Sequence, residues 1–122
     1  MNKGGEGFFK YWLPVIVYAA FIFSLSSVSK PPAPQLFPHC DKVYHILEYT
    51  VFGFLMLRAL FYSKEGFKGI DLRFLAILLC LAYGITDEIH QHFIPQRTME
   101  LMDIISDGIG AYLGQLFFKI KG

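Results

Sequence analysis

Titratable side chains concentrate between residues 87 and 107, in a stretch that begins with Asp87-Glu88 and includes Asp103. Strongly apolar sequence flanks this stretch on both sides. Charged groups are costly to keep in such surroundings, so the stretch is a candidate functional site. A carboxylate held near other carboxylates is suited to act as a general acid or base, and we expect Asp87 or Glu88 to do so. The alternative is a clamp in which one of these acids pairs with a basic side chain, Arg97 or Lys42.

His45 lies earlier in the chain and shares a helical face with Tyr49, because the two are four residues apart. The imidazole could serve as a general base, as a metal ligand, or as a structural hydrogen-bond donor to Asp103 or Asp87. We therefore take four residues as candidate catalytic groups, namely His45, Asp87, Glu88 and Asp103.

Metal binding is a further option, since mixed imidazole and carboxylate ligands suit zinc or manganese. The candidate ligands are His45, Glu88, Asp103 and either His90 or His92. However, Glu88-x-x-x-His92 lacks the paired histidines of the zincin helix motif, and the chain has no cysteine set. The identity of any metal or other cofactor therefore stays open.

Arg97 could hold a phosphate or carboxylate group through two parallel hydrogen bonds. In an enzymatic version of the site, Arg97 and Lys42 would hold an anionic headgroup while His45 exchanges a proton with Asp87 or Glu88. The alternative for Arg97 is a surface pair with Glu100 or a cap on the carboxylates. The candidate substrate-binding residues are Lys42, Tyr49, Gln91, Arg97 and Asp107.

Composition places these residues in a membrane setting. Hydrophobic residues make up 54% of the 122 residues, and the mean hydropathy is +0.43. A soluble domain of this size has too little interior for so many large apolar side chains. The formal net charge of +1 argues against a nucleic-acid partner, because phosphate binding needs a strong basic excess.

Apolar runs and loop signals predict an all-α membrane protein of four transmembrane helices in a single domain, residues 1–122. The expected helices cover residues 11–28, 41–62, 72–91 and 99–119. Pro14 would then lie in the first turn of the first helix, where proline is tolerated. A cleaved signal peptide is the competing interpretation of that first run, but three further apolar segments follow it. The proline-rich stretch from 30 to 38 is expected to be an extended loop.

The distribution of basic residues predicts the orientation of the helices. Most lysines and arginines fall near the two termini and in the 63–71 connection, which the positive-inside rule places in the cytoplasm. All four histidines and most acids then lie toward the outer face. The purely apolar part of the third helix, residues 74–85, covers only about 18 Å, too short for a hydrocarbon core of about 30 Å. We therefore expect the acids to lie below the membrane surface, around a pocket that opens outward.

Three spaced motifs in order carry a family resemblance over nearly the whole chain. They are Asp41-Lys42-x-x-His45-x-x-x-Tyr49, Asp87-Glu88-x-x-Gln91-x-Phe93-x-Pro95-x-Arg97-Thr98 and Asp103-x-x-x-Asp107-x-x-Gly110-Ala111-x-x-Gly114. The chain resembles the VanZ-like family of small membrane proteins. The resemblance implies a bacterial multi-pass protein of the cytoplasmic membrane, in a family named for a member linked to teicoplanin resistance. Two departures are Gln96 where the family often has glycine and Asp107 where it often has asparagine.

Taken together, the sequence predicts an envelope protein with membrane lipids or a lipid-linked precursor as partner. The leading hypothesis is recognition of an anionic lipid or lipid-linked cell-wall precursor, with chemical modification as one version. Alternatives are a non-enzymatic protein whose carboxylates pass cations, protons or lipid, and a structural scaffold. Gly110-x-x-x-Gly114 indicates close helix packing and raises the prospect of a homo-oligomer.

Overall fold

The computed structural model describes residues 3–27, 40–94 and 101–118. They form four α-helices and one short 3-10 helix, and no β-strand occurs within these ranges. The elements are α1 (Lys3–Ser26), α2 (Cys40–Tyr62), η1 (Lys64–Phe67), α3 (Leu72–His92) and α4 (Leu101–Gln115). The all-helical prediction is confirmed, and α2 and α3 closely follow their predicted bounds.

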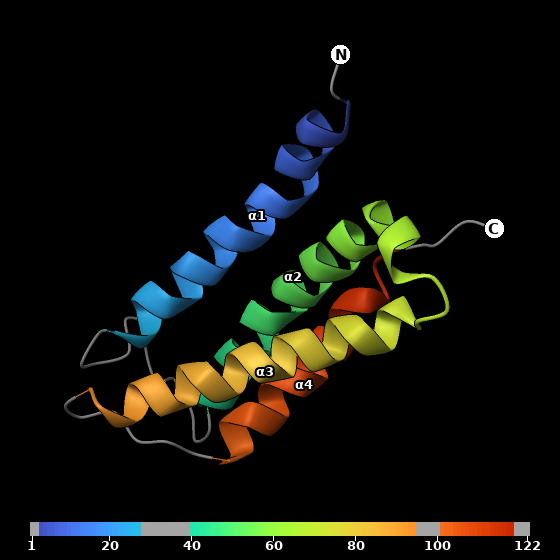
Figure 1. Ribbon diagram of the computed structural model, residues 1–122. Helices are drawn as coiled ribbons and strands as arrows, with labels where there is room; N and C mark the ends of the chain where they lie inside the picture. The colour runs from blue at the N-terminus through green and yellow to red at the C-terminus, as the bar shows by residue number, and fades with distance from the viewer. Residues whose placement is uncertain (1–2, 28–39, 95–100, 119–122) are drawn as a thin grey trace.

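The helices lie side by side as a bundle in which α2 packs most extensively against α4 and also contacts α1 and α3 (Figure 1). One end of the bundle gathers the last turns of α1 and α3 with the first turns of α2 and α4. The opposite end carries η1, which follows α2 and precedes α3. Motifs that are far apart in the sequence therefore meet at a single end of the molecule.

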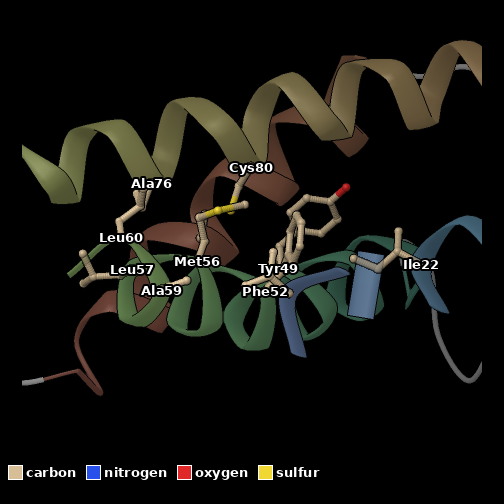
Figure 2. Close-up of a cluster of buried hydrophobic side chains, with 11 residues drawn as sticks. Ile22, Tyr49, Phe52, Met56, Leu57, Ala59, Leu60, Ala76 and Cys80 are labelled. Carbon is tan, nitrogen blue, oxygen red and sulfur yellow. The ribbon is translucent and has the colours of Figure 1, made fainter. Parts of the chain in front are cut away.

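The hydrophobic core forms where α2 faces its neighbours. In the close-up, the buried side chains of Leu60 and Met56 of α2 point toward Ala76 and Cys80 of α3 (Figure 2). Cys80 is a buried free thiol. Small residues on one helix let the bulky side chains of the other fill the space between them.

Glycines bring the backbones of α2 and α4 together. A Cβ atom added to Gly110 would collide with the carbonyl oxygen of Ile46, and one added to Gly114 would collide with that of Thr50. Gly53 on α2 lies equally close to the backbone of α4. Gly110 and Gly114 are thus buried by α2 within the same chain, so the predicted homo-oligomer, which stays a prediction, would need another surface.

We expect Gly114→Ala to lower the free energy of unfolding by about 1–3 kcal/mol, because the new methyl group must displace backbone rather than a flexible side chain. Unfolding of detergent-solubilised protein measures the effect. Gly66→Ala is the matched control, since nothing lies within 4 Å of a Cβ atom at that position. Equal stability of the two variants would show that the α2 and α4 backbones do not touch.

The first helix begins at Lys3, so the predicted start at residue 11 is wrong. The glycines near the N-terminus are weak helix formers, which is why the sequence pattern did not include them. Pro14 consequently lies inside α1 rather than in its first turn. Proline removes the hydrogen bond to the carbonyl four residues earlier, that of Lys10, and Arg58 Nη2 donates to that carbonyl at 3.3 Å.

The last helix ends at Gln115 rather than near 119, which corrects the predicted bound. Arg73 of α3 explains the early end, because its guanidinium donates to the carbonyl oxygens of Gln115 at 3.1 Å and Phe118 at 3.2 Å. Gln115 Nε2 returns a hydrogen bond to Arg73 O at 2.6 Å. Carbonyls at the end of a helix lack partners within it, and a basic side chain can supply them.

Among the described residues, two helices are long and apolar enough to cross a membrane, over Gly7–Ser26 with a mean hydropathy of 1.7 and Lys42–Tyr62 with 1.2. A core helix of a soluble protein and a signal sequence can meet the same criterion. In α1, however, large apolar side chains such as Phe9, Val17 and Phe21 are exposed on the bundle surface. Burial within the bundle therefore does not account for the apolar character of α1.

Candidate functional site

A set of titratable side chains, three of them buried and two half-buried, gathers at the end of the bundle where α2, α3 and α4 meet. We call it the polar cluster, and its members are Lys42, His45, Glu88, Asp103 and Asp107. Glu88 and Asp107 are 0% exposed, and Asp103 is 4% exposed. Each of the three helices contributes at least one member, so the structure brings together residues that are more than forty positions apart in the sequence.

His45 lies between two acids of α4. Its Nδ1 is 2.7 Å from Asp107 Oδ1, a hydrogen-bond distance, and its Nε2 is 3.8 Å from Asp103 Oδ2. Asp103 is also held by Lys42, whose Nζ is 2.9 Å from Asp103 Oδ1. Asp103 and Asp107 share a helical face because they are four residues apart, so α2 can hold both acids at once.

The hydrogen bond to Asp107 orients the imidazole of His45. An ionised carboxylate only accepts hydrogen bonds, so His45 Nδ1 carries the hydrogen of this pair. In the neutral ring, Nε2 then has the free lone pair, and it faces Asp103. Asp107 thus acts on His45 as an orienting group.

The two adjacent acids of α3 face different neighbours. Successive residues on a helix point about 100° apart, and Glu88 lies in the polar cluster while Asp87 faces α1. Ser26 Oγ donates to Asp87 Oδ1 at 2.5 Å, and Gln91 Nε2 donates to Ser26 Oγ at 3.3 Å. Asp87 and Gln91, both predicted to line the pocket, therefore contact the last turn of α1.

Ser26 is a site residue that sequence reasoning missed. It is 3% exposed, and its hydroxyl links α1 to α3. The neighbouring Ser27 Oγ is 2.9 Å from His90 Nε2, and the His90 ring stacks on Phe23 with centroids 4.2 Å apart. The available signal was a group of serines at the end of an apolar run.

Tyr49 lies one helical turn after His45 on α2 and is 0% exposed. Its ring packs edge-on against Phe52 and rises from α2 toward α3 (Figure 2). The hydroxyl oxygen has no hydrogen-bond partner among the described residues. A buried hydroxyl normally has a partner, so this atom marks a position where a ligand group could bind.

Gly84 of α3 makes room for the carboxylate of Asp107. A Cβ atom added to Gly84 would lie 2.6 Å from Asp107 Oδ2, closer than real contacts allow. That oxygen, too, has no hydrogen-bond partner among the described residues. Sequence reasoning did not single out Gly84, although it lies four residues before Glu88 on the same helical face.

An apolar groove runs along the seam between α3 and α4, with a volume of about 560 Å³. Ile77 and Leu81 line one side, and Ile105 and Ile109 line the other. Gly108, which directly follows Asp107, also lines the groove, so the groove and the polar cluster occupy adjacent faces of α4. The volume falls in the range of small-molecule sites.

Potential metal ligands converge in one place within the described residues. His45, Glu88 and Asp103 each offer a ligand atom, and these atoms lie within 4.8 Å of one another. The two histidines considered as additional ligands lie elsewhere: His90 is at Ser27, and His92 packs against Phe93. Arg97 and Glu100 fall outside the described residues, so the predicted roles of Arg97 stay predictions.

A family model described as VanZ/LLP1 matches residues 8–122. No curated protein and no solved structure matches the chain.

Proposed function

The chain belongs to the VanZ/LLP1 family, and on that basis we propose that it recognises an anionic lipid or a lipid-linked precursor of the bacterial cell envelope. Family membership and the two apolar helices indicate a membrane protein. The ligand class is our proposal, and the structure of the polar cluster supports it.

We place all four helices across the cytoplasmic membrane with both termini in the cytoplasm. Like α1, α3 and α4 expose large apolar side chains, among them Phe74, Ile89, Ile109 and Tyr112. The basic residues at the η1 end, such as Arg58 and Lys64, favour the cytoplasmic side. The polar cluster then lies toward the outer face. Because the described part of α4 has 15 residues and spans about 22 Å, we place its acids below the membrane surface.

The observation that carries the proposal is the position of the polar cluster beside the apolar groove. An amphiphilic ligand needs a charged or polar group for its head and an apolar channel for its chain. Lys42 is the cation of the cluster, and a phosphate group is a natural competitor of Asp103 for its ammonium. The groove on the adjacent face of α4 can take an acyl chain.

We expect Lys42→Gln to weaken binding of an anionic phospholipid by about 10-fold, the effect of losing roughly one charge-assisted hydrogen bond. Native mass spectrometry with phosphatidylglycerol and phosphatidylcholine measures the preference. Lys68→Gln is the matched control, because the Lys68 side chain is 79% exposed and pairs at 3.3 Å with Glu65, three residues earlier. Ile105→Trp should fill the apolar groove and weaken the binding of both phospholipids.

Two results would count against the lipid proposal. One is equal binding of the two phospholipids by wild-type protein. The other is a loss of preference in Lys68→Gln as large as that in Lys42→Gln, since this would reflect overall charge rather than the polar cluster.

Chemical modification of the ligand is a second candidate function, favoured by the His45–Asp107 pair. A general base oriented by a carboxylate is a recurrent catalytic arrangement, and His45 has that geometry. Purified protein is incubated with candidate lipids, and mass spectrometry of the lipids then distinguishes chemical modification from binding or transport. A new product supports modification, and unchanged lipids support binding or transport.

A further inference from the structure

Within the polar cluster, three side chains form the donor set of a transition-metal site. The imidazole of His45 and the carboxylates of Glu88 and Asp103 come from three different helices, with ligand atoms within 4.8 Å of one another. Lys42 neutralises part of the charge at Asp103, and a metal cation between the two buried carboxylates would offset their remaining repulsion. Imidazole with carboxylate ligands suits divalent manganese or zinc.

The orientation of His45 is that of a metal ligand. Histidines that bind metals nearly always donate their other ring N–H to a carboxylate or carbonyl, which fixes the ring and its tautomer. His45 Nδ1 has this partner in Asp107 Oδ1 at 2.7 Å. In the neutral tautomer that carries its hydrogen on Nδ1, the lone pair on Nε2 is directed at Asp103, where a metal ion would lie.

The distance between the donors fits an ion. His45 Nε2 and Asp103 Oδ2 are 3.8 Å apart, too far for a hydrogen bond. A divalent ion with bonds of about 2.0–2.2 Å to each atom fits between them. Lys42 contacts the other oxygen of Asp103, so the ammonium and the ion use different oxygens.

Two polar atoms outside the donor set point independently to a ligand at this place. The Tyr49 hydroxyl and Asp107 Oδ2 belong to side chains that are 0% exposed, and neither atom has a hydrogen-bond partner among the described residues. Asp107 Oδ2 faces α3 at Gly84, one helical turn from Glu88. Water molecules bound to a cation in the polar cluster would be hydrogen-bonding partners for such atoms.

We propose that His45, Glu88 and Asp103 bind one divalent metal ion of the manganese or zinc class, with Asp107 as the positioning residue for His45. This inference does not depend on the identity of the lipid. A site that binds metal but not phospholipid would refute the proposed function alone. If the protein binds phospholipid equally well after chelation of the metal, the proposed lipid recognition stands and the metal has no part in it.

Metal content and thermal stability test the proposal. Protein in detergent is stripped with EDTA, incubated with Mn²⁺ and passed through a desalting column before elemental analysis. Mn²⁺ is the probe because sulfur ligands such as the buried thiol of Cys80 compete for it poorly. We expect one bound ion per chain and a rise in unfolding temperature of about 5 °C or more.

Three variants separate ligand roles from structural ones. Glu88→Gln should abolish stoichiometric binding, whereas Asp87→Asn, its sequence neighbour, should bind like wild type because an amide oxygen can still accept from Ser26. Asp107→Asn should weaken affinity by about 10- to 100-fold without abolishing it, as expected of a positioning residue. Size-exclusion profiles confirm that each variant is folded.

The proposal is overturned if wild-type protein retains much less than one ion per chain. It is equally overturned if Glu88→Gln, eluting as a folded protein, binds Mn²⁺ as well as Asp87→Asn does. If Glu88→Gln does not fold, the graded loss in Asp107→Asn decides the question, and an unchanged affinity there contradicts the assigned role of Asp107.

Discussion

His45→Leu is expected to lower the free energy of unfolding by about 3–5 kcal/mol, because it removes the partner of a carboxylate that is 0% exposed. Leucine has a similar volume but offers no hydrogen bond. Asp107 would then be left with neither the imidazole hydrogen nor access to water. The measurement is denaturant unfolding in detergent with EDTA present, so that metal binding does not contribute.

A double variant isolates the interaction energy between His45 and Asp107. We expect His45→Leu with Asp107→Asn to recover about half of the loss or more, since the second change removes the stranded charge at nearly constant shape. His92→Leu is the control, because His92 is exposed at the same end of the bundle and should change stability by less than about 0.5 kcal/mol. If His45→Leu is no more destabilising than His92→Leu, the contact between His45 and Asp107 is not formed.

The second large effect concerns the two neighbouring acids of α3. We expect Glu88→Gln to abolish any protection against teicoplanin that the wild-type protein gives to a susceptible bacterium, while its membrane abundance stays normal. Asp87→Asn should keep both protection and abundance. The physical reason is that Glu88 lies with His45 and Asp103, whereas Asp87 faces Ser26 of α1.

Immunoblots of the membrane fraction supply the control for this comparison. Normal abundance of Glu88→Gln with full protection would show that the acid has no functional role. Loss of abundance in Glu88→Gln, with normal Asp87→Asn, would instead support a scaffold that needs the polar cluster only for folding.

The sequence predicted the four helices and the end of the bundle at which the candidate site residues gather. The bounds of α2 and α3 follow from an N-terminal boundary near Asp41 and long apolar runs, both of which are local signals. The meeting of His45 with Asp103 was predictable because short apolar segments force both residues to a similar depth.

Sequence reasoning could not decide which acid enters the polar cluster. Helix geometry requires the side chains of Asp87 and Glu88 to point about 100° apart. Which of them enters the polar cluster depends on the position of α1, and that is a tertiary property. Ser26 is the residue that settles it in the structure. The end of α4 was missed for a similar reason, since Arg73 satisfies its carbonyls from another helix.

The helix that packs against Gly110 and Gly114 could not be predicted from the sequence either. The spacing of Gly110 and Gly114 predicts a close approach by some helix, within the chain or from a second copy. Only the packing shows that the helix is α2, where Gly53 provides the reciprocal small surface.

The central claim is that the polar cluster binds a ligand rather than only holding helices together. An experimental structure of the protein in a lipid phase, grown with phosphatidylglycerol and Mn²⁺, tests it most directly. We predict density for an ion between His45, Glu88 and Asp103, a headgroup near Lys42, and an acyl chain in the α3–α4 groove. A cluster filled by its own side chains, with neither ion nor headgroup density, would contradict the claim.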